Sequence, residues 1–251
     1  MKCSLFIIAC LICSITFGQL NQVDTQGRKQ GEWAKLYEGT RVFQYKGQFK
    51  NDKPVGKFVY YYESSKVKAV IKHEPNSNRS VAFYYHENGA MMSHGIFRNQ
   101  LKDSVWLNFG PSERISNTET YVNGELNGKK VVYYVPEEVH DKSQIPSGVY
   151  LYRNGVLHGE FTEYFNDLTV KTKGQYDNNK KVGIWDRFQA NGKKMTMTRY
   201  KNGRRHGWCL AYDKFGKEIG RQYYYMGELI EGDRLKARMA HMKAKGINPN
   251  D

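Results

Sequence analysis

The chain of 251 residues has a formal net charge of +14 and only 39% hydrophobic residues, although aromatic residues reach 14%. Its length fits one large domain or two small ones. Disordered chains are poor in aromatic residues, and a collagen chain needs far more glycine than the 24 residues present, so the composition excludes both classes.

The first eighteen residues predict a secretory signal peptide. Lys2 precedes the apolar run Leu5–Cys13, and Thr16–Gly18 offers small residues for cleavage before Gln19. A membrane-spanning helix needs about 20 apolar residues, more than this run supplies. A lipoprotein signal ending at Cys10 is a minor alternative, because it leaves almost no apolar segment upstream. We therefore expect an exported protein, periplasmic or extracellular, without a lipid anchor.

Three of the four cysteines, Cys3, Cys10 and Cys13, lie in this leader, so the mature chain keeps only Cys209. An internal disulfide is therefore excluded, although exported proteins often use them. We expect the fold to be stabilised by packing alone.

An internal repeat of about 24 residues occupies positions 19–232. Each unit has an anchor position, and the anchor glycines are Gly31, Gly56, Gly128, Gly159, Gly183, Gly207 and Gly232, with Ser80 and Ser104 at the other two anchors. Seven residues before the anchors lie Phe49, His73, Phe97, Tyr121, Tyr152, Tyr176, Tyr200 and Tyr225. Five residues before them lie Asn51, Asn99, Asn123, Asn154, Asn178 and Asn202. A second aromatic cluster follows five or six residues after the anchors.

Each unit predicts a β-hairpin of two strands of about six residues. Turn sequences such as Asn88-Gly89 and Asn191-Gly192 divide the two strands. Between units, the phased Asn and Gly favour a second turn, because both accept a positive φ at low cost. A hairpin with aromatic residues on one face must stack on its neighbours to bury them. The sequence thus predicts an all-β fold, an elongated, curved array of about eight hairpins with a short C-terminal helix.

The unit from Gly128 to Gly159 is about seven residues longer than the others. The segment Pro136–Pro146 predicts a lengthened hairpin loop. Long loops cost little additional entropy, so a tolerated surface insertion is the favoured interpretation, and a contact loop is the alternative.

Residues 233–251 predict a terminal helix, since helix formers extend to Lys245 and are followed by Gly246. Leu235, Met239 and Met242 share one helical face. We expect this helix to cap the last repeat, with a basic helix for an anionic membrane or partner as the alternative.

The phased Tyr-x-Asn-Gly-x-x-x-Gly, most complete at Tyr121–Gly128, Tyr152–Gly159 and Tyr200–Gly207, resembles the bacterial variant of the MORN repeat. The resemblance covers about Gly31 to Gly232. It implies an elongated array of hairpins with a role in scaffolding, dimerisation or binding of anionic phospholipids. Some bacterial members are labelled YwqK-like antitoxins, which implies a toxin neutraliser as a third function.

A catalytic function is not expected, because the sequence has no Gly-x-Ser-x-Gly, phosphate-binding loop or His-Glu-x-x-His motif. His158 and His206 both directly precede an anchor glycine, so the repeat explains them better than catalysis does. We predict a non-enzymatic interaction protein without a cofactor or metal.

The candidate anion-binding residues are Lys180, Lys181, Lys193, Lys194, Arg204, Arg205, Arg238 and Lys243. Such residues bind phosphates through salt-sensitive contacts. Export argues against nucleic acid as the natural ligand. A protein partner is the favoured hypothesis, and an anionic lipid or glycan surface is the alternative. Basic side chains that only keep strand edges from pairing would also fit.

Overall fold

The computed structural model describes residues 20–110, 113–135 and 144–250. Within these ranges, nineteen strands form one antiparallel sheet and a single helix follows them. The all-β hairpin array with a short C-terminal helix is therefore confirmed. The predicted signal peptide lies outside the described residues, and so does most of the predicted inserted loop.

The strands follow one another along the chain with short turns between them. The first half consists of β1 (Gln22–Val23), β2 (Lys29–Leu36), β3 (Phe43–Lys50), β4 (Lys53–Tyr61), β5 (Val67–His73), β6 (Arg79–Tyr85), β7 (Met91–Arg98), β8 (Leu101–Phe109) and β9 (Ile115–Val122). The second half consists of β10 (Glu125–Tyr133), β11 (Pro146–Arg153), β12 (Val156–Tyr164), β13 (Val170–Asp177), β14 (Lys180–Phe188), β15 (Lys194–Lys201), β16 (Arg204–Arg205), β17 (Gly207–Tyr212), β18 (Glu218–Tyr225), β19 (Glu228–Ile230) and the helix α1 (Gly232–Ala244). The expected strand length of about six residues was too short, because most strands have seven to nine.

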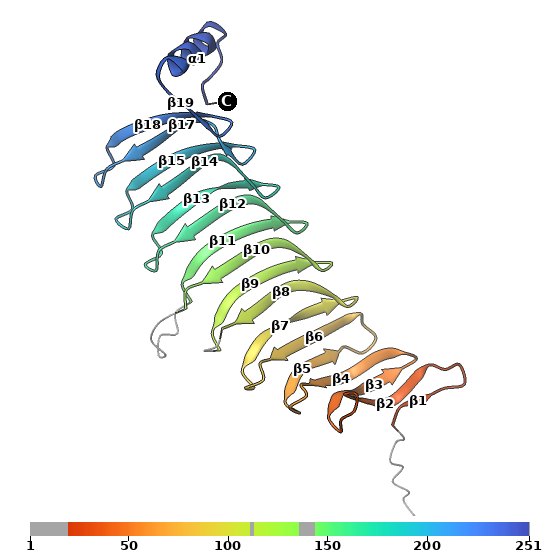
Figure 1. Cartoon of the computed structure of the whole chain (residues 1–251). Coiled ribbons are helices and arrows are strands. Elements are labelled where there is room, and N and C mark those ends of the chain that lie inside the picture. The colour runs from red at the N-terminus through yellow and green to blue at the C-terminus, as the bar shows by residue number, and fades with distance from the viewer. Residues whose placement is uncertain (1–19, 111–112, 136–143, 251) are drawn as a thin grey trace, which may run out of the picture.

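Each strand pairs with its neighbour in the chain, so the hairpins stack in sequence order into one long row (Figure 1). The row runs from β2 at one end to β18 and α1 at the other. The chain exposes 17375 Å² to solvent, whereas a compact protein of this mass exposes about 11,500 Å². The single-layer sheet contributes to this large exposed area.

The phased Asn and Gly residues have the backbone conformation that the repeat predicts. Every Asn of the column has a positive φ, from 48° at Asn178 to 53° at Asn51. The residue after it also has a positive φ in most turns, as at Asn179 and Gly203, which is the type I′ geometry. The anchor glycines have positive φ values too, from 57° at Gly232 to 119° at Gly128.

The anchor glycines of the array lie where the strand register shifts. In β4, for example, the pairing with β3 jumps across Gly56, and the same jump recurs in later repeats. Such bulges bend the bulged strand. Ser80 lies in a pair without a shift, whereas Ser104 has a φ of 60°. Gly232 differs from the other anchors, because it is the first residue of α1 and no ninth hairpin follows it.

Much of the core is a column of side chains two residues after the anchors. Its buried members are Phe58, Ala82, Trp106, Phe161 and Trp185, which are between 0% and 8% exposed. Rings of the predicted aromatic column contact them edge to face, as Phe97 does Trp106 at 5.0 Å and Tyr176 does Trp185 at 5.0 Å between centroids. In the last unit, the member of the aromatic column is Tyr224, because Tyr224 pairs with the anchor Gly207. The sequence prediction of Tyr225 for this position was therefore wrong by one residue.

Large core rings lie over glycines of the preceding unit. A Cβ at Gly47, Gly95 or Gly174 would come within 2.4 Å of the ring of Phe58, Trp106 or Trp185, respectively. Each ring stands eleven residues after its glycine. Where the glycine is absent, the contact differs. The ring of Phe161 lies 5.0 Å from that of Tyr150, which stands eleven residues before it. Ile71 faces Ala82, and Glu119 forms an ion pair of 2.8 Å with Lys130.

Hydroxyl groups of the second aromatic cluster connect successive hairpins. The hydroxyls of Tyr37, Tyr62 and Tyr134 donate to the carbonyl oxygens of Tyr61, Tyr85 and Tyr164 at 2.7, 2.8 and 2.6 Å. These contacts repeat the same bond at the same end of the hairpins. They add a side-chain connection between units to the backbone pairing.

The helix α1 packs at the C-terminal end of the sheet. Met242 is 5% exposed, and its sulfur lies 3.6 Å from the hydroxyl of the fully buried Tyr223. Beyond the helix, the side chain of Asn250 accepts a hydrogen bond from the backbone N–H of Trp208 at 3.1 Å. The C-terminal segment thus contacts both strands of the last hairpin.

Candidate binding surface

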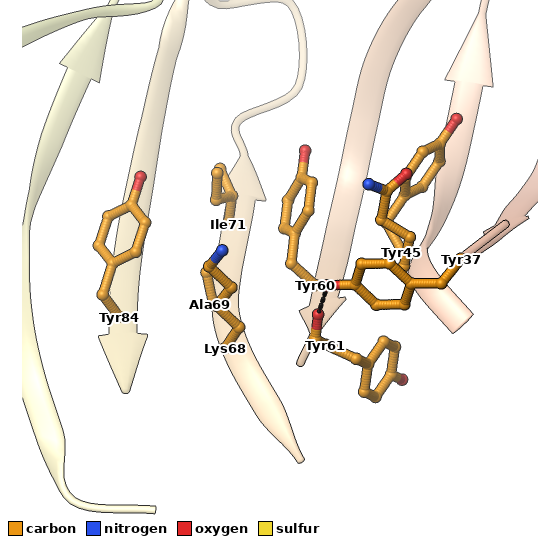
Figure 2. A pocket seen from close by; sticks show the side chains of 9 residues that line it. Tyr37, Tyr45, Tyr60, Tyr61, Lys68, Ala69, Ile71 and Tyr84 are labelled. Atoms are coloured by element: carbon orange, nitrogen blue, oxygen red, sulfur yellow. Dashed lines mark hydrogen bonds between the residues drawn. The ribbon is translucent and has the colours of Figure 1, made fainter. Parts of the chain in front are cut away.

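A groove of about 510 Å³ opens on the face of the sheet near the N-terminal end of the array. Figure 2 shows its tyrosines, which come from the first three hairpins. The lining residues are Tyr37, Gln44, Tyr45, Tyr60, Tyr61, Lys68, Ala69, Ile71 and Tyr84. We call this the tyrosine groove. Its lining contains one charged side chain, Lys68, and no carboxylate.

The floor and two walls of the tyrosine groove are set by strand register. Tyr60 of β4 and Tyr84 of β6 both pair directly with Ala69 of β5. Adjacent strands lie about 4.8 Å apart, so the two tyrosines are separated by roughly 9.6 Å. Ala69 is only 3% exposed, and its methyl group leaves the space between the two rings open.

The core column supports these tyrosines from one side. Phe58 lies 6.2 Å from Tyr45 and 6.3 Å from Tyr60, and Trp106 lies 6.2 Å from Tyr84, between ring centroids. The tyrosines therefore share the face of the buried rings. Tyr45 and Tyr60 also contact each other at 5.9 Å. Rings that are packed on one side lose little entropy when a ligand covers the other side.

Burial raises the pKa of the Tyr60 hydroxyl, and its neighbour Tyr45 raises it further. Burial and Tyr60 raise the pKa of Tyr84 in the same way. Both hydroxyls are therefore protonated at neutral pH and can donate hydrogen bonds. In addition, the hydroxyl of Tyr37 is already bonded to the Tyr61 carbonyl at the rim (Figure 2).

The row of tyrosines four residues after the anchors ends after the third hairpin. Asn108 and Asn117 replace the tyrosine positions in β8 and β9 and bond to each other at 2.8 Å. Next to them, Glu119 accepts hydrogen bonds from Lys130 at 2.8 Å and Tyr121 at 2.9 Å. Burial, with Glu119 beside it, raises the pKa of Tyr121 to about 12. The groove is thus one local feature of the array.

Three of the candidate anion-binding residues lie over aromatic rings, two of them in the strands of the array. The Lys181 ammonium is 4.1 Å from the ring of Trp185, and burial lowers its pKa. Arg205 lies over Tyr224 and donates to its hydroxyl at 3.1 Å. Lys29 and Lys102 lie over Trp33 and Trp106 in the same way, each four residues before its tryptophan. These cations contribute to the packing of the array.

Lys180 and Arg204 are exposed beside turns between repeats. A Cβ at Gly203 would lie 3.6 Å from Lys180, and one at Gly227 would lie 3.7 Å from Arg204. The two basic residues therefore occupy equivalent positions in successive repeats, on the same side of the array. Neither has an ion pair among the described residues.

The other four candidates lie elsewhere. Lys193 and Lys194 follow the turn at the opposite end of β14, and Lys194 forms an ion pair with Asp186 at 3.0 Å. On α1, Arg238 lies 3.4 Å from the ring centroid of Tyr225, and Lys243 is exposed. The eight candidates do not form one site.

The two repeat histidines have different surroundings. His158 lies 3.2 Å from the carboxylate of Asp177, and His206 is 3% exposed and contacts Tyr225. No group of three or more His, Cys, Asp or Glu side chains suited to a metal ion occurs in the described part of the chain. Within the same residues, no helix is long and apolar enough to span a membrane.

No family model and no curated protein matches the chain. Among solved structures, one of S. aureus TarM in complex with Fondaparinux, alpha-GlcNAc-glycerol and UDP is 12% identical, with a TM-score of 0.25 over 51% of this chain and 19% of that chain. Another crystal structure of TarM is 11% identical, with a TM-score of 0.24 over 52% of this chain and 20% of that one. This chain spans only a small part of their length, and similarity at these TM-scores indicates neither a fold nor an activity.

The tyrosine groove was not predicted from the sequence. A signal was present, since Tyr60 and Tyr84 both stand four residues after an anchor. The two aromatic columns predicted from the repeat lie at other positions, seven residues before and five or six residues after the anchors. The function of Ala69 as a floor depends on cross-strand register, which follows from the bulges and is not visible in the repeat spacing.

Proposed function

We propose that this chain is a non-enzymatic interaction protein, an exported array of bacterial MORN-type hairpins that binds a protein partner through the tyrosine groove. The supporting observation is the set of half-buried tyrosines over Ala69 on an otherwise single-layer sheet. Tyrosine is enriched in protein interfaces, because it offers a large apolar ring together with a hydroxyl. The uncovered face leaves room for a partner of any length along the array.

Affinity capture with groove variants tests this function. The full mature chain is immobilised, and an envelope extract is passed over it at low and high salt, with bound proteins identified by mass spectrometry. We expect one stoichiometric protein that remains bound at high salt, because contacts with aromatic rings are not screened by ions. The double variant Tyr60→Ala/Tyr84→Ala is expected to lose this protein.

Two matched variants make the result specific. Tyr60→Phe/Tyr84→Phe keeps both rings and is expected to retain most of the binding. Val105→Ala/Val122→Ala removes apolar side chains that are 51% and 47% exposed elsewhere on the sheet, and it is expected to leave capture unchanged. If the alanine groove variant captures the same protein as the wild type, the groove is not the binding surface.

Binding to an anionic lipid or glycan surface is the second candidate function. The exposed pair Lys180 and Arg204, on successive turns and without ion pairs among the described residues, favours it. Vesicles containing phosphatidylserine then bind the wild-type chain at low salt and release it at high salt. The variant Lys180→Gln/Arg204→Gln is expected to bind these vesicles more weakly. If the variant and the wild-type chain bind equally well, Lys180 and Arg204 are not the anion site.

A further inference from the structure

The last hairpin leaves the C-terminal edge of the sheet partly open. On its inner side, β18 pairs with β17 at Glu218 and from Gly220 to Tyr224, and a register shift leaves Ile219 between these pairs without a partner in β17. On its outer side, β19 pairs only with Tyr223–Tyr225. Within the described residues, no backbone hydrogen bond closes the outer side of residues 218–222. Unpaired edge groups of this kind are a template for another strand.

The N-terminal edge is closed more completely. The strand β1 pairs with Lys29 and Gln30 of β2. Asn21 continues the cover, because its N–H donates to the Glu32 carbonyl at 2.9 Å and its side chain accepts from the N–H of Ala34 at 2.9 Å. The two ends of the same sheet therefore differ, and only the C-terminal edge offers a run of free backbone groups.

The two most exposed large hydrophobic side chains of the described chain lie on this last hairpin. Phe215 is 74% exposed and Ile219 is 67% exposed. Phe215 occupies the tip of the turn, where the earlier repeats have Gly39, Asn88 and Asn191. An aromatic side chain at a turn tip has no function in forming the turn itself, so it is available to a ligand.

The charge around the open edge is positive. Lys214 and Lys217 flank Phe215, and neither forms an ion pair in the described part of the chain. Arg221 is paired with Glu218 at 2.7 Å. A second copy of this chain, with its net charge of +14, would meet repulsion here. A segment that carries carboxylates would be attracted.

We propose that the outer edge of β18 binds an extended segment of another protein as an additional antiparallel or parallel strand, and that this segment alternates apolar side chains with carboxylates. The apolar side chains pack beside Ile219 and Phe215, and the carboxylates face Lys214 and Lys217. The backbone of residues 218–222 supplies the hydrogen bonds, as in strand addition at other sheet edges. This inference rests on the proposed function as an interaction protein, but it uses the opposite end of the array from the tyrosine groove.

Peptide probes test the proposal on the full mature chain. The first probe is a capped, fluorescein-labelled peptide of alternating valine and glutamate, about six residues long as in a usual strand. The second replaces glutamate by lysine, and the third has a central proline, which cannot continue a strand ladder. We expect the valine–glutamate peptide to bind at least about tenfold more tightly than either of the others. Hydrogen exchange of the amides in residues 218–222 is expected to slow when it binds.

Two lysine variants separate the edge from the sheet face. Ile219→Lys places a charge on the open edge and is expected to weaken peptide binding about tenfold, because edge lysines block strand addition. Met195→Lys changes the residue at the same repeat position 24 residues earlier, within the interior strand β15, and is expected to have no effect. Equal effects of both variants, tight binding of the proline peptide, or unchanged exchange in residues 218–222 would overturn the proposal.

Sedimentation velocity tests whether a second copy occupies the edge instead. We expect the chain without peptide to sediment as a monomer. A dimer that is lost in Ile219→Lys would overturn the proposal in favour of self-association. Failure of the wild-type chain to bind the valine–glutamate peptide, with partner capture at the groove intact, would contradict this inference alone. Ile219→Lys is expected to keep partner capture at the groove, because Tyr60 and Tyr84 are unchanged in it.

Discussion

At the scale of single residues, the array is stabilised by a large side chain on one hairpin that packs over a glycine on the neighbouring hairpin. A glycine on one strand makes room for a Phe or Trp ring eleven residues later, as for Gly95 and Trp106. The indole N–H of Trp106 also donates to the Ile96 carbonyl at 3.0 Å. A single-layer sheet has no second layer that could compensate for a lost contact, so Phe58, Trp106 and Trp185 each depend on the glycine eleven residues before them.

This dependence predicts the effect of two glycine substitutions. A Cβ at Gly95 would lie 2.3 Å from the ring of Trp106, so Gly95→Ala is expected to destabilise the fold by about 1–3 kcal/mol through overpacking. Gly220 has nothing within 4 Å of a Cβ, and Gly220→Ala is expected to stay within about 0.5 kcal/mol. Chemical denaturation of both variants measures the difference. Equal free energies of unfolding for the two variants would contradict the dependence of Trp106 on Gly95.

The only histidine of the aromatic column predicts a dependence of stability on acid. Burial lowers the pKa of His73 below its usual 6.5, and its Nδ1 lies 2.8 Å from the Ser80 hydroxyl. The folded state therefore disfavours the charged ring. The stability contributed by the neutral ring is complete above pH 6.5 and is lost as the pH falls toward the lower pKa of the folded state.

The variant His73→Phe is expected to remove this part of the acid sensitivity, since Phe keeps the edge-to-face contact with Phe58 and does not titrate. The measurement is the free energy of unfolding between neutral and mildly acidic pH for both chains. An identical pH dependence of the two chains would show that His73 does not contribute.

At the scale of elements, the C-terminal helix is expected to stabilise mainly the last hairpin. Met242→Ala removes a side chain that is 5% exposed and contacts Tyr223, and such changes cost about 2–5 kcal/mol. Because repeats contact only their neighbours, amide exchange is expected to accelerate in β17 and β18 and to stay unchanged in β4–β6. Lys243→Ala, at an exposed position, is the control. Unchanged exchange in β17 and β18 would refute a cap.

The sequence predicted these elements well because their signals are local. Asn and Gly at fixed spacing determine the turns, and the helix was expected within one residue of its first residue, Gly232. The strand lengths were underestimated because the bulges add residues to each strand. The eleven-residue rule joins two strands of different hairpins, so it becomes visible only when the register between them is known.

At the scale of the whole molecule, one sheet of stacked hairpins predicts an elongated particle. A globular protein of this length has a radius of gyration of about 18 Å. Small-angle scattering is expected to give a clearly larger value. A compact radius would contradict a single-layer array in solution.

The repeat predicted this elongation, because identical units that bury one face must stack in a row. It did not predict where ligands bind, because binding depends on what breaks the repeat. Tyr60 and Tyr84 flank Ala69 only in the first hairpins, and Phe215 replaces a polar turn residue only in the last. Such features are departures from the shared pattern, and their meaning depends on which residues pair across strands.

Site-specific photo-crosslinking tests the central claim, that the tyrosine groove binds a protein partner. A photoreactive benzoylphenylalanine is placed at Tyr84 in one chain and at Ile184, which is 45% exposed on an interior strand, in another. We predict that illumination of native cells gives one protein adduct from position 84 that persists at high salt, and none from position 184. No adduct from position 84, or the same adducts from both positions, would contradict the claim.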